Sequence, residues 1–140
     1  MKTFKPIFSN AARLREMGNE LILNKLAQAG LSNVAPSHGD VLVYLLKVRS
    51  CRMTDLAKAV GRSKSTLTTL VEKLEREKLL VREADSEDSR AVIVQLTEKG
   101  LQLQPAFESI SKDLESFLTA RLSEEEVQTL DRLLRKAVDR

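Results

Sequence analysis

The middle of the chain constrains the fold most, because the hydrophobic period changes there from that of helices to that of strands. Apolar residues repeat with helical spacing over Asp55–Val60 and over Ser63–Lys78, and Gly61 lies between the two runs. Two short β-prone runs follow, Leu79–Val81 and Ala91–Leu96, separated by a polar, turn-rich segment. This order of a short helix, a glycine-containing turn, a second helix and a two-stranded hairpin predicts a winged helix-turn-helix.

Residues that commonly begin helices mark the starts of the elements. Thr54 is expected to cap the first helix of the pair, and Ser63 the second. Thr97 is expected to cap a helix after the hairpin, in which Pro105 should introduce a kink or set the first turns apart. Ser123, followed three residues later by a glutamate, forms a capping box that opens a last helix.

Two further helices are expected before the helix pair. The first runs from about Ser9, a suitable cap, to Ala29, and Gly30 stops it at the position of a C-cap glycine. The second begins near Pro36–Ser37, because proline suits the first helical turn. The first helix is apolar on more than one face, so we expect it to contact two partners.

Charge is unevenly distributed along the chain. The net charge is only +3, but residues 47–64 contain six basic side chains and one acidic side chain, Asp55. Residues 101–140 contain six basic and eight acidic side chains. A basic middle beside a mildly acidic end is the asymmetry expected of a protein that contacts a polyanion with its centre, and an ordinary solvated surface is the alternative.

The second helix of the pair carries side chains that suit contact with DNA. In this motif the N-terminal residues of the second helix meet base edges in the major groove. Small hydroxyl residues allow close approach, and they are mediocre helix formers, so their number here indicates a reason other than stability. The first half of the helix has no acidic residue. The candidate DNA-binding residues are Arg62, Ser63, Lys64, Ser65, Thr66, Thr68, Thr69 and Lys73, with Arg76 on the same face.

The chain resembles the MarR family of bacterial transcription regulators. Residues 56–80 look like the helix-turn-helix of that family, and Asp85–Arg90 followed by Leu96–Gly100 is similar to its wing signature. The wing spacing of Asp, two residues, Asp, one residue and Arg is quite specific in this context, and the order of the helices agrees along essentially the whole chain. The resemblance implies a sequence-specific DNA-binding regulator and not an enzyme. It further implies a ligand-responsive dimeric repressor.

The resemblance also implies roles for single residues. Arg90 would reach from the wing into the minor groove, where a narrow groove attracts arginine, and Asp88 would orient it. The alternative is a surface ion pair, which would add little stability. Lys78 stands where the family usually has glycine. A left-handed backbone there would strain the lysine by roughly 1 kcal/mol, whereas a regular turn would not.

The implied architecture is mainly α with a small β-hairpin wing in one domain, residues 1–140. Residues of about 35–98 would form the winged helix-turn-helix, and those of about 7–30 and 100–140 the dimerisation helices. A homodimer would present two recognition helices to a pseudo-palindromic operator in double-stranded DNA. Family members often hold small effectors, commonly aromatic acids, between these two parts. No cofactor is expected.

Composition excludes other classes. A single cysteine, Cys51, and a single histidine, His38, make an internal disulfide and a zinc site implausible. No apolar run is long enough to span a membrane, and the first residues lack the apolar centre of a secretory signal, so a cytoplasmic protein is expected.

Two residues invite further hypotheses. His38 is a candidate ligand or sensor residue near an effector pocket or the dimer interface. Cys51 lies beside Arg49 and Arg52, whose charges would lower its pKa and make it reactive, so a redox-responsive regulator is an alternative. A winged-helix interaction module that binds no DNA is another. No catalytic constellation supports an enzyme.

Overall fold

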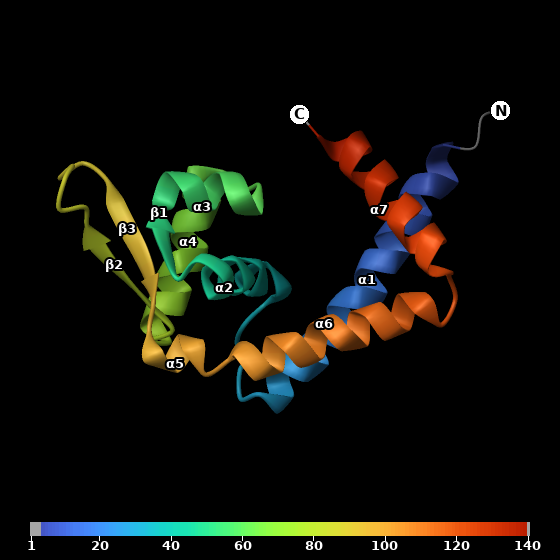
Figure 1. Cartoon of the computed structure of the whole chain (residues 1–140), viewed down its shortest axis with the longest axis horizontal. Helices are drawn as coiled ribbons and strands as arrows, with labels where there is room; N and C mark the ends of the chain where they lie inside the picture. Colours follow the sequence, from blue (N-terminus) through green and yellow to red (C-terminus); the bar gives the residue numbers. More distant parts are fainter. Residues whose placement is uncertain (1–3, 140) are drawn as a thin grey trace.

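The computed structural model of the chain describes residues 4–139, which form seven helices and three short strands (Figure 1). In chain order these are α1 (Phe4–Gln28), α2 (Pro36–Val48), β1 (Ser50–Arg52), α3 (Met53–Val60), α4 (Lys64–Arg76), β2 (Leu80–Ala84), β3 (Val92–Leu96), α5 (Glu98–Leu101), α6 (Gln104–Thr119) and α7 (Glu124–Val138). The predicted mainly α class with a β wing is confirmed.

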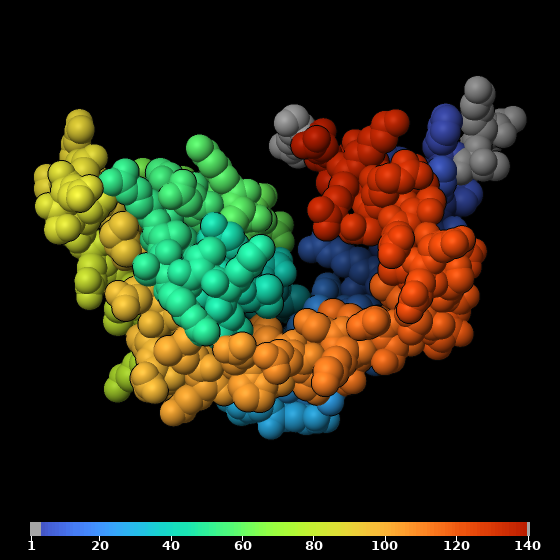
Figure 2. Space-filling view, viewed as in Figure 1, coloured from blue at the N-terminus to red at the C-terminus, as the bar shows by residue number. Residues whose placement is uncertain are grey.

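The elements gather in two parts that α6 connects (Figure 1). Helices α2 to α5 and the sheet form one part, and α7 with the N-terminal half of α1 rises at the other end of α6. A deep hollow separates the two parts on the face seen in Figure 2. No helix among the described residues is long and apolar enough to cross a membrane.

The strands form one antiparallel sheet in the order β1-β3-β2. Strands β2 and β3 are the predicted hairpin, with Leu80 opposite Leu96. A third strand that the sequence did not indicate extends this hairpin: β1 pairs with the other side of β3 and places Cys51 opposite Val94. Three residues without alternating hydrophobicity give no strand pattern, so β1 follows from its pairing alone.

The hydrophobic core belongs almost entirely to the winged helix. Leucines of α2, α3 and α4, with Val94 of β3, are fully buried, and no polar side chain is buried among the described residues. Helix α1 contributes only Leu26 to the core, and α7 has no buried residue. Phe107 and Ile110 of α6 complete this core, so most of it lies in the winged helix, whereas α7 adds nothing to it.

Most of the predicted helix starts are confirmed. Ser63 Oγ accepts a hydrogen bond from the Thr66 amide at 3.2 Å, and Thr97 Oγ1 accepts one from the Gly100 amide at 3.1 Å. Ser123 and Glu126 exchange the two bonds of a capping box, at 2.9 and 3.1 Å. Pro105 lies in the first turn of α6, and α5 is a separate short helix before it. Of the two predicted effects of Pro105, a kink or separated first turns, the second is therefore confirmed.

Two predicted starts were wrong. Helix α1 begins at Phe4 and not near Ser9, so Pro6 lies in its first turn, where a missing amide hydrogen is tolerated. Thr54 does not cap α3, which begins one residue before it with Arg52 at the N-cap position and no capping side chain. The pairing of β1 with β3 holds Arg52 in extended backbone and sets the helix start there.

The C-terminal end of α4 is joined tightly to the start of α5. Lys78 has φ of 64°, so its backbone is left-handed, which decides between the two conformations considered above. Thr97 Oγ1 donates to the Lys78 carbonyl at 2.7 Å, and its amide donates to the Leu79 carbonyl at 3.0 Å. Lys99 Nζ donates to the Glu77 carbonyl at 3.0 Å. These bonds satisfy carbonyls that the end of a helix leaves unpaired.

Gly100 completes this joint and yields a prediction. A Cβ atom at Gly100 would clash with the Leu79 carbonyl oxygen and with the Leu96 side chain. Gly100→Ala should therefore lower the free energy of unfolding by about 1–3 kcal/mol, as overpacking does. The matched control Gln102→Ala, at an exposed position of the same turn, should stay within about 0.5 kcal/mol. Urea denaturation measures both, and equal values for the two variants would contradict this account.

Candidate nucleic-acid interface

The first two turns of α4 expose most of the predicted recognition residues. Ser63, Lys64, Ser65, Thr66 and Thr69 are exposed, and Thr68 is half-buried. The apolar face of the helix, Leu67, Leu70, Val71 and Leu74, is buried against the core. The sequence therefore folds into a helix that presents hydroxyl and basic side chains to solvent on one side.

Several of these hydroxyl groups already make hydrogen bonds within α4. Thr68 Oγ1 donates to the Lys64 carbonyl at 2.8 Å, and Thr69 Oγ1 donates to the Ser65 carbonyl at 3.3 Å. Such bonds to the carbonyl four residues earlier slightly destabilise a helix, so they do not explain the hydroxyl residues by stability. Because each hydroxyl oxygen keeps acceptor lone pairs, each can still accept a bond from a base amino group.

Two basic residues, Arg62 before α4 and Lys73 near its C-terminal end, have acidic partners. Arg62, in the turn before α4, has Nη2 3.8 Å from Asp40 Oδ2 of α2. Lys73 has Nζ 3.6 Å from Glu77 Oε1. Both pairs are partly exposed and add little stability. Lys64, the first residue of α4, forms no ion pair with any residue from 4 to 139.

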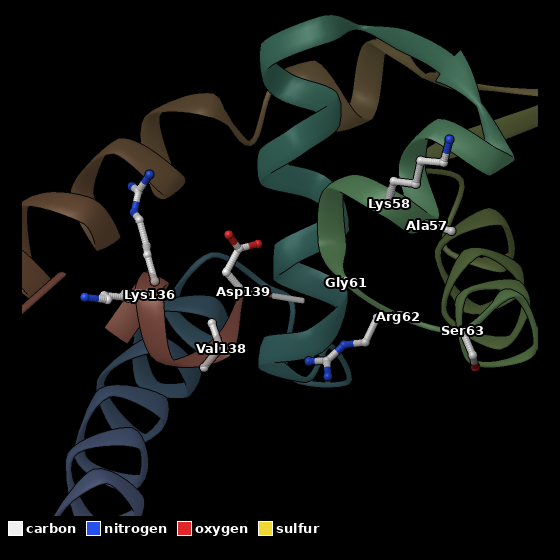
Figure 3. A pocket seen from close by; sticks show the side chains of 9 residues that line it. Ala57, Lys58, Gly61, Arg62, Ser63, Lys136, Val138 and Asp139 are labelled. Atoms are coloured by element: carbon white, nitrogen blue, oxygen red, sulfur yellow. The ribbon is translucent and has the colours of Figure 1, made fainter. Parts of the chain in front are cut away.

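Arg62 also lies beside the hollow between the two parts of the molecule. Figure 3 shows Gly61, Arg62 and Ser63 on one side of a cavity of about 1110 Å³ that Val138 and Asp139 of α7 line from the other side. The helix-turn-helix and the end of α7 therefore face one another across an open space.

The wing carries Arg90 on an ordered turn. The Arg90 side chain is 91% exposed, and Asp88 Oδ1 accepts bonds from its backbone amide at 3.0 Å and from its Nε at 3.4 Å. An ion pair with an arginine this exposed contributes little to stability. The bonds do restrict the directions in which the guanidinium can point.

Two ion pairs at the base of the wing were missed in the sequence. Asp85 Oδ2 accepts from Arg52 Nη2 at 2.6 Å, and Glu75 Oε1 accepts from Arg82 Nη2 at 2.9 Å. The Glu87 amide, and then Arg52, lower the pKa of Asp85, and Arg82 lowers that of Glu75. No spacing in the sequence signals these pairs, because the strands of the sheet bring their members together.

The wing and α4 meet at one cleft. Lys64 and Thr68 of α4 line it from one side, and Arg90 and Val92 line it from the wing. Arg90, which is expected to contact the minor groove, thus lies at the same cleft as Lys64 and Thr68, which are expected at the major groove. The sequence predicted these residue types, but it did not predict that they share a cleft.

His38 has a structural task in α2. Its Nδ1 atom accepts a hydrogen bond from the Ala35 amide at 3.0 Å, so the half-buried side chain caps the start of the helix. Burial lowers the pKa of His38, and the charge of Lys73 lowers it further. The neutral imidazole is therefore the form that the fold requires.

Cys51 lies on β1, half-buried against the core. The prediction that neighbouring arginines lower its pKa was wrong. Burial raises the pKa of the Cys51 thiol, and the carboxylate of Asp55 raises it further. Because the thiolate is the reactive form, this environment gives no support to a redox sensor at Cys51. No cluster of metal-ligating side chains occurs within residues 4–139.

The helix pair, the wing and their exposed basic residues define a winged helix-turn-helix protein. A sequence model described as the MarR family matches residues 32–91. The solved DNA complex of MepR from S. aureus is 30% identical and covers 99% of this chain and 98% of that chain, with a TM-score of 0.80. The chain belongs to the MarR family, which confirms the resemblance seen in the sequence.

Other relatives agree. The HTH-type transcriptional regulator MhqR of Bacillus subtilis is 35% identical over 72 residues, which are 51% of this chain and 49% of that protein. The chain thus matches about half the length of this curated relative. A mutant MarR from E. coli, solved in complex with operator DNA, is 22% identical over 95% of this chain and 94% of that chain, with a TM-score of 0.83, and shows the same fold. The family is one of transcription regulators and not of enzymes.

The capping role of His38 predicts a pH dependence of stability. Nδ1 can accept the Ala35 bond only while it is unprotonated, and the folded-state pKa lies below the ordinary value of 6.5. The unfolded chain therefore binds more protons, and stability falls as the pH drops below about 6.5. His38→Gln keeps an acceptor at this position but does not titrate. We expect urea denaturation between pH 7 and 5 to show a steeper loss for the native protein, and equal slopes would contradict the role.

Proposed function

We propose that this protein is a sequence-specific DNA-binding transcription regulator that acts as a homodimer. One observation carries the proposal: the acid-free start of α4 and the exposed Arg90 border the same cleft. Helix α4 can enter a major groove while Arg90 reaches the adjacent minor groove. The DNA complexes of MepR and of MarR, which share this fold, support the same use of the surface.

The DNA-reading residues are part of the proposal. Ser65, Thr66 and Thr69 are exposed at the start of α4 and would meet base edges, with Thr68 at the margin of the same face. Ser63 and Lys64 stand at the helix N-terminus, where a phosphate is well placed. Arg62 and Lys73 would contact the backbone after releasing their acidic partners, and Asp88 would orient Arg90.

The dimer is proposed from the apolar surface outside the winged helix. Phe4 and Phe8 of α1 are 63% and 76% exposed, and Val138 of α7 is 71% exposed. Leu133 and Leu134 add to the exposed apolar face of α7. Exposed apolar side chains gathered on two helices in this way indicate an interaction site, and a second copy of the same helices can cover them with two-fold symmetry. We assign about residues 7–30 and 100–140 to this interface, of which Arg140 lies outside the described residues.

An effector site is proposed in the groove between α2 and α6. Val43, Leu46 and Phe107 give it an apolar floor, and Lys47 and Lys112 stand at its edge. Its volume of about 460 Å³ lies in the range of small-molecule sites. Glu108 also lines the groove, so two lysines and one carboxylate leave one net positive charge, and an apolar ring with one negative charge fits this lining. A ligand that prefers the unbound protein geometry would release DNA and relieve repression.

The remaining assignments follow from this function. A regulator that binds chromosomal DNA works in the bacterial cytoplasm, and nothing in its described residues requires a cofactor. His38 acts as a helix cap and not as a ligand, and the burial of Cys51 disfavours a redox-responsive regulator. A winged-helix module that binds only proteins does not require a helix face of hydroxyl residues without acids, nor an exposed arginine beside it.

The function is tested by selecting bound duplexes from a random DNA library at near-physiological salt. We expect enrichment of a pseudo-palindrome with half-sites about one helical turn apart, as a symmetric dimer requires. Arg90→Ala should bind that operator about 10- to 100-fold more weakly, because a specific groove contact contributes roughly 1–3 kcal/mol.

The matched control is Lys5→Ala, which removes one exposed positive charge in the first turn of α1, outside the helix pair and the wing. It should leave operator affinity within about twofold. Binding that depends on salt but enriches no sequence would contradict the proposal and favour the protein-interaction module. Enrichment of a single half-site would contradict the dimer.

The effector site is tested on the protein–operator complex. We expect salicylate, an aromatic acid small enough for the groove, to release operator from the native protein at millimolar concentration. The paired change Lys47→Glu and Lys112→Glu should raise the concentration needed by about tenfold, because it replaces attraction for the carboxylate by repulsion. Release at equal concentrations from both proteins would exclude this groove.

A further inference from the structure

The cleft between the wing and α4 contains more basic side chains than the sequence indicated. Arg52 of β1, Lys64 of α4, Arg82 of β2 and Arg90 of the wing line a space of about 180 Å³, and no acidic side chain lines it. Four cations from four segments thus converge on a volume that accommodates a small anion. Three of these cations have a carboxylate partner outside the cleft, and Lys64 has none, so the lining keeps a positive charge that favours an anion.

Carboxylates outside the cleft hold the arginines by one edge. Asp85 binds Arg52 only through Nη2, at 2.6 Å. Glu75 binds Arg82 through Nε and Nη2, at 3.3 and 2.9 Å. A guanidinium has five N–H donors in a fixed plane. The Nε and Nη1 groups of Arg52 and the Nη1 group of Arg82 make no hydrogen bond to any described residue, so they remain available to a bound anion.

The other groups at the cleft are also donors. Lys64 forms no ion pair within residues 4–139. Thr54, in the first turn of α3, and Thr68 of α4 place hydroxyl groups at the lining. No side chain caps the start of α3, whose first-turn amides therefore still need acceptors. Cations, hydroxyls and amides together make a donor set that matches phosphate oxygens.

We propose that this cleft binds one phosphate of the DNA backbone, with Arg52 and Arg82 as its principal ligands. The inference rests on the proposed function and names a contact within it. In a duplex, the sugar–phosphate backbone is the boundary between the major and minor grooves. A strand that passes between α4 in one groove and Arg90 in the other must cross the cleft between them. The bound phosphate then fixes the register of both readings.

The test is a scan of the selected operator with single neutral methylphosphonate groups along one half-site. For the native protein, neutralising one particular phosphate should weaken binding by about tenfold, since a charge-assisted hydrogen bond is lost. Arg52→Gln and Arg82→Gln should each bind the unmodified operator about tenfold more weakly. Both should be insensitive to neutralisation of that same phosphate, and the dependence of affinity on salt should become shallower.

Arg52→Lys keeps the charge and should recover part of the affinity, and Lys5→Gln, at an exposed position of α1, serves as the surface-charge control. Circular dichroism melting checks that each variant is folded. The proposal is overturned if the two arginine variants keep the full phosphate profile, or if they lose sensitivity at different phosphates. If inorganic phosphate alone protects the cleft, the cleft is a site for a free anion and not for a phosphate of DNA, and the proposal is overturned. Failure of the native protein to bind any duplex would instead overturn the proposed function.

Discussion

The pairing of β3 with strands on both of its sides is the constraint on which the DNA-facing surface depends. Strand β2 follows α4 and leads into the wing, whereas β1 follows α2 and leads into α3. By binding both, β3 fixes the start of α3, the base of the wing and the end of α4 relative to one another. Arg52 and Arg82 come to the same cleft only through this sheet.

The uneven distribution of buried apolar residues between the two parts of the molecule is equally important for its architecture. Apolar residues of α2, α3, α4 and the sheet bury one another within a single chain, and no polar side chain is buried with them in the described part. Helix α7 is strongly amphipathic but buries none of its residues. The half that carries the proposed DNA contacts therefore holds most of the buried core, completed by Leu26 of α1 and by Phe107 and Ile110 of α6, while α7 in the proposed dimer half buries no residue.

Local sequence signals predicted those parts of the fold that local interactions determine. The caps at Ser63 and Ser123 and the break at Pro105 involve residues within one turn of each other, so they can be read directly. Strand β1 could not be predicted, because its three residues are a strand only by virtue of β3. The start of α3 was misplaced for the same reason.

The residues of the candidate site could likewise be predicted where local sequence patterns determine them, and not where contacts between distant segments do. The hydroxyl and basic face of α4 and the exposed Arg90 follow from residue types and helical spacing. The Arg52–Asp85 pair joins residues 33 positions apart, and the sign of the pKa shift at Cys51 depends on burial and Asp55, so neither follows from neighbours in sequence. The MarR resemblance supplied the role of Arg90 but not the pairs that support the wing.

The joint between α4 and α5 has a mechanical consequence. The carbonyls of Glu77, Lys78 and Leu79 are bonded to the segment that begins α5, and Gly100 packs directly against one of them. These bonds join the two segments directly, so a displacement of α5 would also displace the C-terminal end of α4. Helix α4 is held at its C-terminal end by these bonds, so a small rotation there would displace its N-terminal end, which carries the proposed DNA contacts, by a larger distance.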